Sequence, residues 1–216
     1  MAEVVKTRRA YNGARRQEQA RRTRWEIVQA AHALFLELGF SATTMPQVAE
    51  HAGVSVQTVY KNFANKAGLV KAVFDAAIAG DDDPRPMLER ARLAAAHAEP
   101  DPRRKFVMYG QFLAQVAPRH VPIQLLIRDA AASDTDAASA WEQLQRERLR
   151  GMTQFAKALH DAGHLAKGIS MQEARDVLWT YNSAELFQLL VLQRGWSPRR
   201  YGNWVSRQLT TALLNE

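Results

Sequence analysis

Cysteine is absent from the 216-residue sequence, and no apolar run approaches the ~18 residues that a membrane-spanning helix requires. The lack of cysteine excludes disulfides, thiol catalysis and thiolate metal sites, and it is compatible with a reducing compartment. The N-terminus is basic and lacks the apolar core of a secretory signal peptide. We therefore expect a cytoplasmic protein with no membrane partner.

Glycine is also sparse, at 11 residues, whereas the helix-forming residues Ala, Leu, Arg, Glu and Gln recur throughout. No strand-like alternation of apolar and polar residues is evident, and apolar residues recur instead at helical spacing. The sequence predicts an all-α fold. Its length allows a small N-terminal domain joined to a larger C-terminal one, with a core that needs no metal or disulfide.

Positive charge is concentrated at the N-terminus. The formal net charge is +7, and the first 24 residues hold eight cations against two anions, an excess of six. Such a run is either a solvated tail or an arm that binds a polyanion. We interpret residues 1–20 as a basic arm, disordered without DNA, that follows the phosphate backbone or enters a minor groove. Arg21 and Arg22 extend this basic set.

Helix start and stop signals follow one another closely after the arm. Gly39 ends a helix that begins near residue 21, Pro46 lies in the first turn of a short helix over 45–52, and Asn65 caps a helix that follows. Between them, Gly53-Val54-Ser55 forms a tight turn before a short helix over 56–62. Two such short helices around a glycine turn are typical of a helix-turn-helix, which places its second helix in the DNA major groove.

These residues resemble the DNA-binding domain of the TetR (tetracycline-repressor-like) family of bacterial regulators. The similarity covers residues 23–70, and its most specific parts are Thr43-Thr44, the run from Val48 to Ser55, the run from Thr58 to Phe63, and Asn65-Lys66. It implies a repressor, less often an activator, whose homodimer binds a palindromic double-stranded DNA operator and is released by a small effector.

The resemblance also implies roles for individual residues. Thr44, Tyr60 and Lys66 would hold phosphates, and Ser55, Gln57, Thr58 and Lys61 would approach bases or backbone. Many family members have glycine where this chain has Gln57, whose amide can pair with an adenine edge. The predicted DNA-binding residues are Arg21, Arg22, Thr43, Thr44, Ser55, Gln57, Thr58, Tyr60, Lys61 and Lys66.

The C-terminal part reads as a helical dimerisation and effector-binding domain. We expect a domain junction at the acidic, proline-containing segment 80–86, separate helices over 103–117 and 122–132, and single helices over 135–162 and 171–194. The 171–194 helix is apolar on nearly every side, so it should be buried on its own domain and on a partner subunit, together with the 135–162 helix. A central helix of a monomer is the alternative.

An effector pocket is the least specific prediction, because aromatic stripes at helical spacing are more often plain core. The candidates for an apolar or aromatic effector are Phe106, Tyr109, Leu113, Arg128, Arg148, Met152, Phe155, Trp179 and Asn182. Arg148 is the polar member of its stripe and can equally pair with an acid or extend to solvent.

The sequence contains no nucleophile elbow and no phosphate-binding glycine loop, and the His160 and His164 pair is interrupted by Gly163. We therefore expect neither an enzyme nor a metal or cofactor site. The expected division is a basic arm (1–20), a three-helix DNA-binding domain (21–68), a connecting helix (69–80) and the C-terminal domain (81–216). A ligand-responsive regulator is the leading hypothesis, and a constitutive DNA-organising protein is the alternative.

Overall fold

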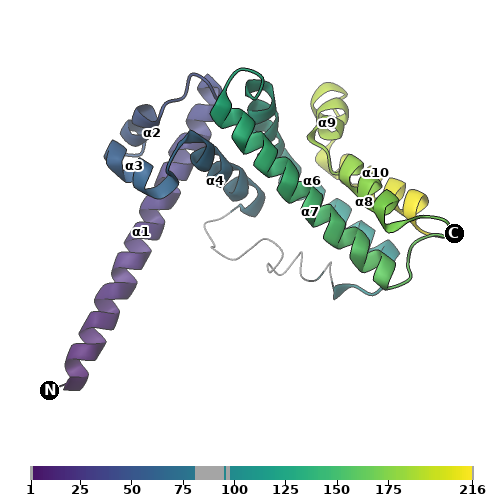
Figure 1. Cartoon of the computed structure of the whole chain (residues 1–216), viewed down its shortest axis with the longest axis horizontal. Helices are drawn as coiled ribbons and strands as arrows, with labels where there is room; N and C mark the ends of the chain where they lie inside the picture. Colours follow the sequence, from purple (N-terminus) through teal and green to yellow (C-terminus); the bar gives the residue numbers. More distant parts are fainter. Residues whose placement is uncertain (1, 81–94, 96–97, 216) are drawn as a thin grey trace.

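The computed structural model describes residues 2–80, 95 and 98–215, with side chains described from residue 15 onward. Throughout these residues the ordered elements are helices and no strand occurs, so the predicted all-α fold is confirmed. A long first helix leads into three short helices, and two long antiparallel helices connect these to the C-terminal helices (Figure 1). Much of the expected junction, from residue 81 to 86, lies outside the described residues.

The N-terminal helices are α1 (Ala2–Leu38), α2 (Met45–His51), α3 (Val56–Phe63) and α4 (Lys66–Ala79). Gly39 and Gly80 adopt positive φ directly after α1 and α4, the conformation that favours glycine at a helix C-terminus. Asn65 caps α4 by accepting a hydrogen bond from the Gly68 amide. The predicted end of α1 and the predicted bounds of α2 and α3 therefore hold to within one or two residues.

Helix α1 differs from the expected disordered arm, because it begins at Ala2 and runs without interruption to Leu38. The segment contains no proline, and most of its residues are good helix formers. Ion pairs one turn apart, Arg21 with Glu18 and Arg22 with Glu26, both at 2.9 Å, add a small stabilisation. The basic segment is thus the first part of α1, and it extends away from the rest of the molecule (Figure 1).

The C-terminal helices are α6 (Pro102–Ala130), α7 (Thr135–Asp161), α8 (Met171–Tyr181), α9 (Ala184–Phe187), the π-helix η2 (Gln188–Gln193) and α10 (Pro198–Leu213). The expectation of two helices over 103–132 is wrong, because α6 continues through Pro118 and Pro122. Each proline costs about 3 kcal/mol in a helix interior. Burial of the apolar side chains on both sides of the prolines offsets this cost.

The expected single helix over 171–194 is also wrong. Helix α8 ends at Tyr181, and the Ser183 hydroxyl accepts a hydrogen bond from the Leu186 amide and starts α9. A serine in this position offers the backbone a helix cap in place of helix continuation. The chain after α8 therefore takes a new direction through α9 and η2 (Figure 1).

Two apolar clusters make up the core. The first is formed by α1, α2, α3 and α4 together with Ile123 and Ile127 of α6 and Leu144 of α7. The second lies among α6, α7, α8, α9 and α10, where Gly110 of α6 and Gly202 of α10 bring the two helix backbones into direct contact. Because α6 and α7 contribute to both clusters, they connect the N-terminal helices mechanically to the C-terminal ones.

Candidate nucleic-acid interface

The turn between α2 and α3 has the tight geometry of a helix-turn-helix. Gly53 has φ +65°, its amide donates to Glu50 O at 3.1 Å, and the Val54 amide donates to Ala49 O at 3.0 Å. Ser55 then caps α3 by accepting from the Thr58 amide at 3.2 Å. These bonds hold the start of α3 directly against the end of α2.

Helix α3 is amphipathic, with one buried face and one exposed polar face. Val59 and Phe63 are buried in the first apolar cluster. On the opposite side Gln57, Tyr60 and Lys61 are exposed, with 48% of Tyr60 accessible to solvent. Because residues three and four apart share one helix face, these three side chains form a continuous polar edge.

The hydroxyl residues predicted to contact DNA also hold the helix-turn-helix together. Thr44 and Gln47 form a capping box at the start of α2, with the Thr44 amide donating to Gln47 Oε1 at 2.8 Å. The hydroxyls of Ser55 and Thr58 lie 2.8 Å apart at the start of α3. Thr44 and Ser55 are exposed and Thr58 is half-buried, so these caps lie at the same surface as the polar edge.

Thr43 is a correction to the predicted site. It is only 1% exposed, and its hydroxyl donates to Leu34 O at 3.1 Å and to Gly39 O at 2.8 Å. These bonds join the loop to the end of α1, where helix carbonyls would otherwise lack donors. Thr43 therefore has a structural role and does not reach the surface.

Lys66 is held inside the N-terminal domain. Its Nζ donates to Ser41 O at 3.3 Å and lies 4.2 Å from the centre of the Phe40 ring. Partial burial lowers the pKa of Lys66, although Asp134 and Asp136 oppose the shift. The bond to Ser41 O uses one of the three donors of the Lys66 ammonium group.

Sequence reasoning did not assign a role to Arg24, which connects α1 to the end of α3. Its Nη1 donates to Asn62 O at 2.9 Å, and its guanidinium lies 4.3 Å from the centre of the Phe63 ring. Partial burial lowers the pKa of Arg24, with Asp75 acting in the opposite direction. Arg24 and Asn62 lie 38 residues apart in the sequence, so no local pattern could have revealed this contact.

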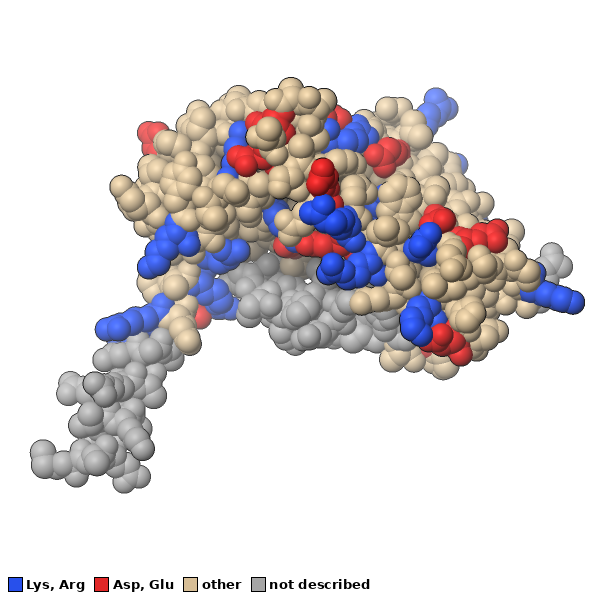
Figure 2. All heavy atoms as spheres, in the orientation of Figure 1, with Lys and Arg blue, Asp and Glu red and all other residues tan. Residues whose placement is uncertain are grey.

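The exposed cations of α1 lie next to this domain. Arg15, Arg16, Arg21 and Arg22 are all exposed, and Lys and Arg side chains gather where α1 leaves the body of the molecule (Figure 2). Their positive charge and the polar edge of α3 belong to the same N-terminal part of the chain. This combination suits a polyanion whose backbone is long enough to contact both.

In the C-terminal part, most of the predicted pocket residues come together. Phe106, Tyr109, Leu113, Met152 and Phe155 are buried in the second apolar cluster, and the Phe155 ring lies 5.8 Å from Phe106 and 5.3 Å from Tyr109 between ring centres. The Tyr109 hydroxyl donates to Met152 Sδ at 3.8 Å. Burial raises the pKa of Tyr109 above its ordinary value, so it stays protonated and can donate.

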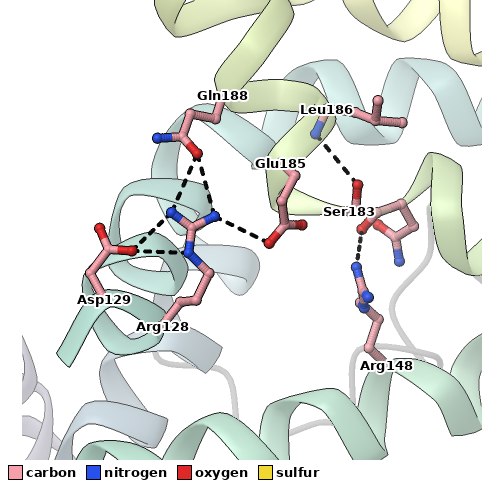
Figure 3. A network of polar contacts seen from close by, with 8 residues as sticks. Arg128, Asp129, Arg148, Ser183, Glu185, Leu186 and Gln188 are labelled. Atoms are coloured by element: carbon pink, nitrogen blue, oxygen red, sulfur yellow. Dashed lines mark hydrogen bonds and ion pairs between the residues drawn. The ribbon is translucent and has the colours of Figure 1, made fainter. Parts of the chain in front are cut away.

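Arg148, Trp179 and Asn182 lie beside this cluster. The Arg148 guanidinium is 4.2 Å from the centre of the Trp179 ring, and its Nη1 donates to Asn182 O at 3.1 Å (Figure 3). Its Nε is buried without a hydrogen-bond partner, and so is Oε1 of Gln145. Burial lowers the pKa of Arg148, although Glu185 and Tyr109 oppose the shift.

Arg128 belongs to a different contact. It bonds Asp129 at 2.8 Å and Glu185 at 3.2 Å, and it bonds Gln188 at 3.4 Å, which fastens the end of α6 to α9 and η2 (Figure 3). Because these acceptors use the N–H donors of the Arg128 guanidinium, Arg128 links α6 to α9 and η2. The structure therefore does not place Arg128 with the aromatic pocket candidates.

Large apolar side chains remain exposed in the part expected to dimerise. Leu189 and Leu192 of η2 are 50% and 53% exposed, and Trp179 of α8 and Leu149 of α7 are also exposed.

Within the described residues, no helix combines the length and the apolar character that crossing a membrane requires. The same residues contain no cluster of three or more His, Asp or Glu side chains placed to hold a metal ion.

Comparison with known proteins supports the resemblance that the sequence suggested. Residues 27–73 match the family of bacterial regulatory proteins called the tetR family. The HTH-type transcriptional regulator TtgR of Pseudomonas putida is 43% identical over 61 residues, which is 28% of this chain and 29% of TtgR. The alignment thus spans less than a third of this curated relative.

Solved structures extend the fold similarity to nearly the whole chain. NalD, the secondary repressor of the MexAB-OprM multidrug efflux pump in Pseudomonas aeruginosa, has a TM-score of 0.69 at 19% identity and covers 92% of this chain and 99% of its own. FadR from Bacillus subtilis, solved in complex with stearoyl-CoA, has a TM-score of 0.66 at 18% identity and covers 86% of this chain and 96% of its own.

Proposed function

We propose that the protein is a sequence-specific DNA-binding transcriptional regulator, because residues 27–73 match the tetR family of bacterial regulatory proteins. The observation that carries the proposal is the polar edge of α3, where Gln57, Tyr60 and Lys61 are exposed beside a tight helix-turn-helix. A recognition helix reads bases with such side chains after it enters the major groove.

The residues divide into those that position DNA and those that read it. In this proposal the phosphates are held by Lys61 and Tyr60 and by the hydroxyl residues at the helix starts, Thr44, Ser55 and Thr58, and Arg21 and Arg22 add charge along α1. Phosphate contacts fix orientation but carry no sequence information. Gln57 is the proposed reader, since its amide presents one donor and one acceptor, which is the pattern that an adenine edge pairs with.

The regulator acts as a homodimer in this proposal. Leu189 and Leu192 of η2 and Trp179 of α8 are exposed apolar side chains that a second copy can cover. A two-fold dimer presents two α3 helices to successive major grooves about 34 Å apart, which matches a palindromic operator. The DNA site expected for such a dimer is therefore a duplex with two-fold symmetry.

A small apolar or aromatic effector would release the DNA, so that the protein acts as a repressor. Support comes from the aromatic cluster of Tyr109 and Phe155, from the buried and unpaired Nε of Arg148, and from the relatives NalD and FadR, described as a pump repressor and as a complex with stearoyl-CoA. An effector acts only if it favours one arrangement of the two DNA-binding domains over the other.

The test begins with selection of a preferred duplex from a random-sequence pool by the full-length chain. We expect Gln57→Ala to lower the preference for the selected duplex over random DNA by about ten-fold, which is ~1.4 kcal/mol and lies within the ~1–3 kcal/mol of a lost base contact. Lys61→Ala should weaken binding to both duplexes and reduce the slope of log affinity against log salt by about 1. Lys157→Ala, an exposed lysine of α7, is the matched control and should leave both affinities unchanged.

Two results would contradict the proposal. If no duplex is enriched and random DNA binds as tightly as any other, the chain is a constitutive DNA-organising protein. If Lys157→Ala weakens DNA binding as much as Lys61→Ala does, the polar edge of α3 is not the DNA-binding surface.

A further inference from the structure

A cleft of about 340 Å³ lies where α1, α4 and α6 meet, outside the aromatic cluster of the C-terminal helices. This volume is at the lower end of the range for small-molecule sites. Three helices supply its walls, and the residues that decide its chemistry are Trp25, His32, Val73, Ala76, Arg119 and Pro122.

The floor and sides of the cleft are apolar and well fixed. Val28 of α1 and Val73 of α4 are buried, and the Trp25 indole and the Pro122 ring are partly buried. A planar or compact hydrocarbon group can pack between the indole and these aliphatic surfaces, which stabilises it roughly in proportion to the apolar area removed from water.

The polar groups in the wall are donors or neutral. Arg119 is held rigidly, since its Nε donates to Ala77 O at 2.9 Å and its Nη2 to Ile78 O at 3.2 Å. Its Nη1 takes part in neither bond. Burial lowers the pKa of His32, so the ring is neutral at pH 7 and can donate one hydrogen bond.

Among the described lining residues of the cleft, the only formal charge is positive. Of the described residues that line it, none is Asp or Glu, while Arg119 supplies a full positive charge and Gln29 and Trp25 supply N–H donors. Charge-assisted hydrogen bonds between a guanidinium and a carboxylate are about twice as strong as neutral ones. The combination of apolar walls and a fixed cation is complementary to an organic acid.

We propose that this cleft is a second small-molecule site, which binds a compact apolar carboxylate with its hydrocarbon part against Trp25 and its carboxylate toward Arg119. The site is distinct from the aromatic cluster around Tyr109 and Phe155. A consequence rests on the proposed function: a ligand there touches α1, α4 and α6 at once, so a ligand that binds one orientation of the DNA-binding helices relative to α6 better than another shifts DNA affinity.

Phenylpropanoate is a suitable probe, and phenylpropanamide is its neutral counterpart. Calorimetric titration of the full-length chain should show that the acid binds about ten-fold more tightly than the amide, because only the acid forms an ion pair with Arg119. Ala76→Leu adds bulk inside the cleft and should weaken binding of the acid by about ten-fold. Ala33→Leu adds the same bulk on the exposed side of α1 and should leave binding unchanged.

A spectroscopic measurement locates the ligand independently of any effect on folding. Tryptophan fluorescence should change when the acid binds, and Trp25→Phe should remove most of that change while calorimetric binding persists. Equal affinity for acid and amide, no effect of Ala76→Leu, or a fluorescence change that survives Trp25→Phe would each overturn the proposal. A chain that binds the acid as expected but binds no DNA supports this site and contradicts only the proposed function.

Discussion

Substitution of Gly110 in α6 by alanine, which adds one methyl group, tests the packing of α6 against α10. A Cβ placed there would overlap the backbone carbonyl oxygen of Gly202 and lie 3.1 Å from Cβ of Ser206. Because the carbonyl belongs to the backbone of α10, no side-chain rotation relieves the overlap. Gly110→Ala therefore forces α6 and α10 apart.

The expected magnitude is the balance of two terms. Alanine in a helix interior is favoured over glycine by about 1 kcal/mol, while overpacking against a rigid neighbour costs about 3 kcal/mol. The net effect is a decrease of about 2 kcal/mol in the free energy of unfolding. For a chain of this length, that corresponds to a fall in melting temperature of about 4–8 °C.

Gly151 of α7 provides the matched control, because nothing lies within 4 Å of a Cβ placed there. Gly151→Ala should raise the free energy of unfolding by about 0.5–1 kcal/mol, since only the helix-propensity term remains. Thermal unfolding followed by circular dichroism, at one protein concentration, measures both variants. A rise in melting temperature for Gly110→Ala, or shifts of the same sign for the two variants, would refute the close helix contact.

Two further predictions concern buried polar groups. Burial lowers the pKa of His120 to about 4, whereas an unfolded histidine titrates near 6.5, so the native state resists protonation. The contribution of neutral His120 to the free energy of unfolding is complete above pH 6.5 and decreases by at most about 3 kcal/mol as the pH falls toward 4. Denaturant titrations at several pH values should show that His120→Gln loses this pH dependence. An unchanged pH profile in the variant would contradict the prediction. Thr43→Val removes the hydroxyl that donates to Leu34 O and Gly39 O and should lower the free energy of unfolding by about 1–2 kcal/mol without changing the affinity of the folded protein for DNA; a specific loss of DNA affinity would restore Thr43 to the DNA-binding set.

The helix-turn-helix was predictable because its determinants are local. Gly53 provides the positive φ of the turn, and Ser55 and Asn65 cap the helices that follow them. Each signal acts within four residues of its partner, so the sequence alone reveals both the signal and the element. The exposed edge of α3 follows from the same local pattern, since burial of Val59 and Phe63 turns Gln57, Tyr60 and Lys61 outward.

The errors have a different origin. Pro118 and Pro122 are local stop signals, yet α6 continues through them because its flanking residues are buried by distant helices. Thr43 was expected to contact DNA, but its hydroxyl donates to Leu34 O and Gly39 O at the end of α1. For α6, burial by distant helices outweighs the local stop signals, whereas Thr43 is held by carbonyls four and nine residues back along the chain.

The sequence by itself determined the helical class, the limits of the short N-terminal helices and the polar edge that is proposed to read DNA, because spacing, caps and turn residues act over a few positions. Only the tertiary structure decided that Arg128 links α6 to α9 while Arg148 lies beside the aromatic cluster, and that α1, α4 and α6 enclose a cleft. Such arrangements depend on which distant surfaces meet when the chain packs, and no local pattern encodes that choice.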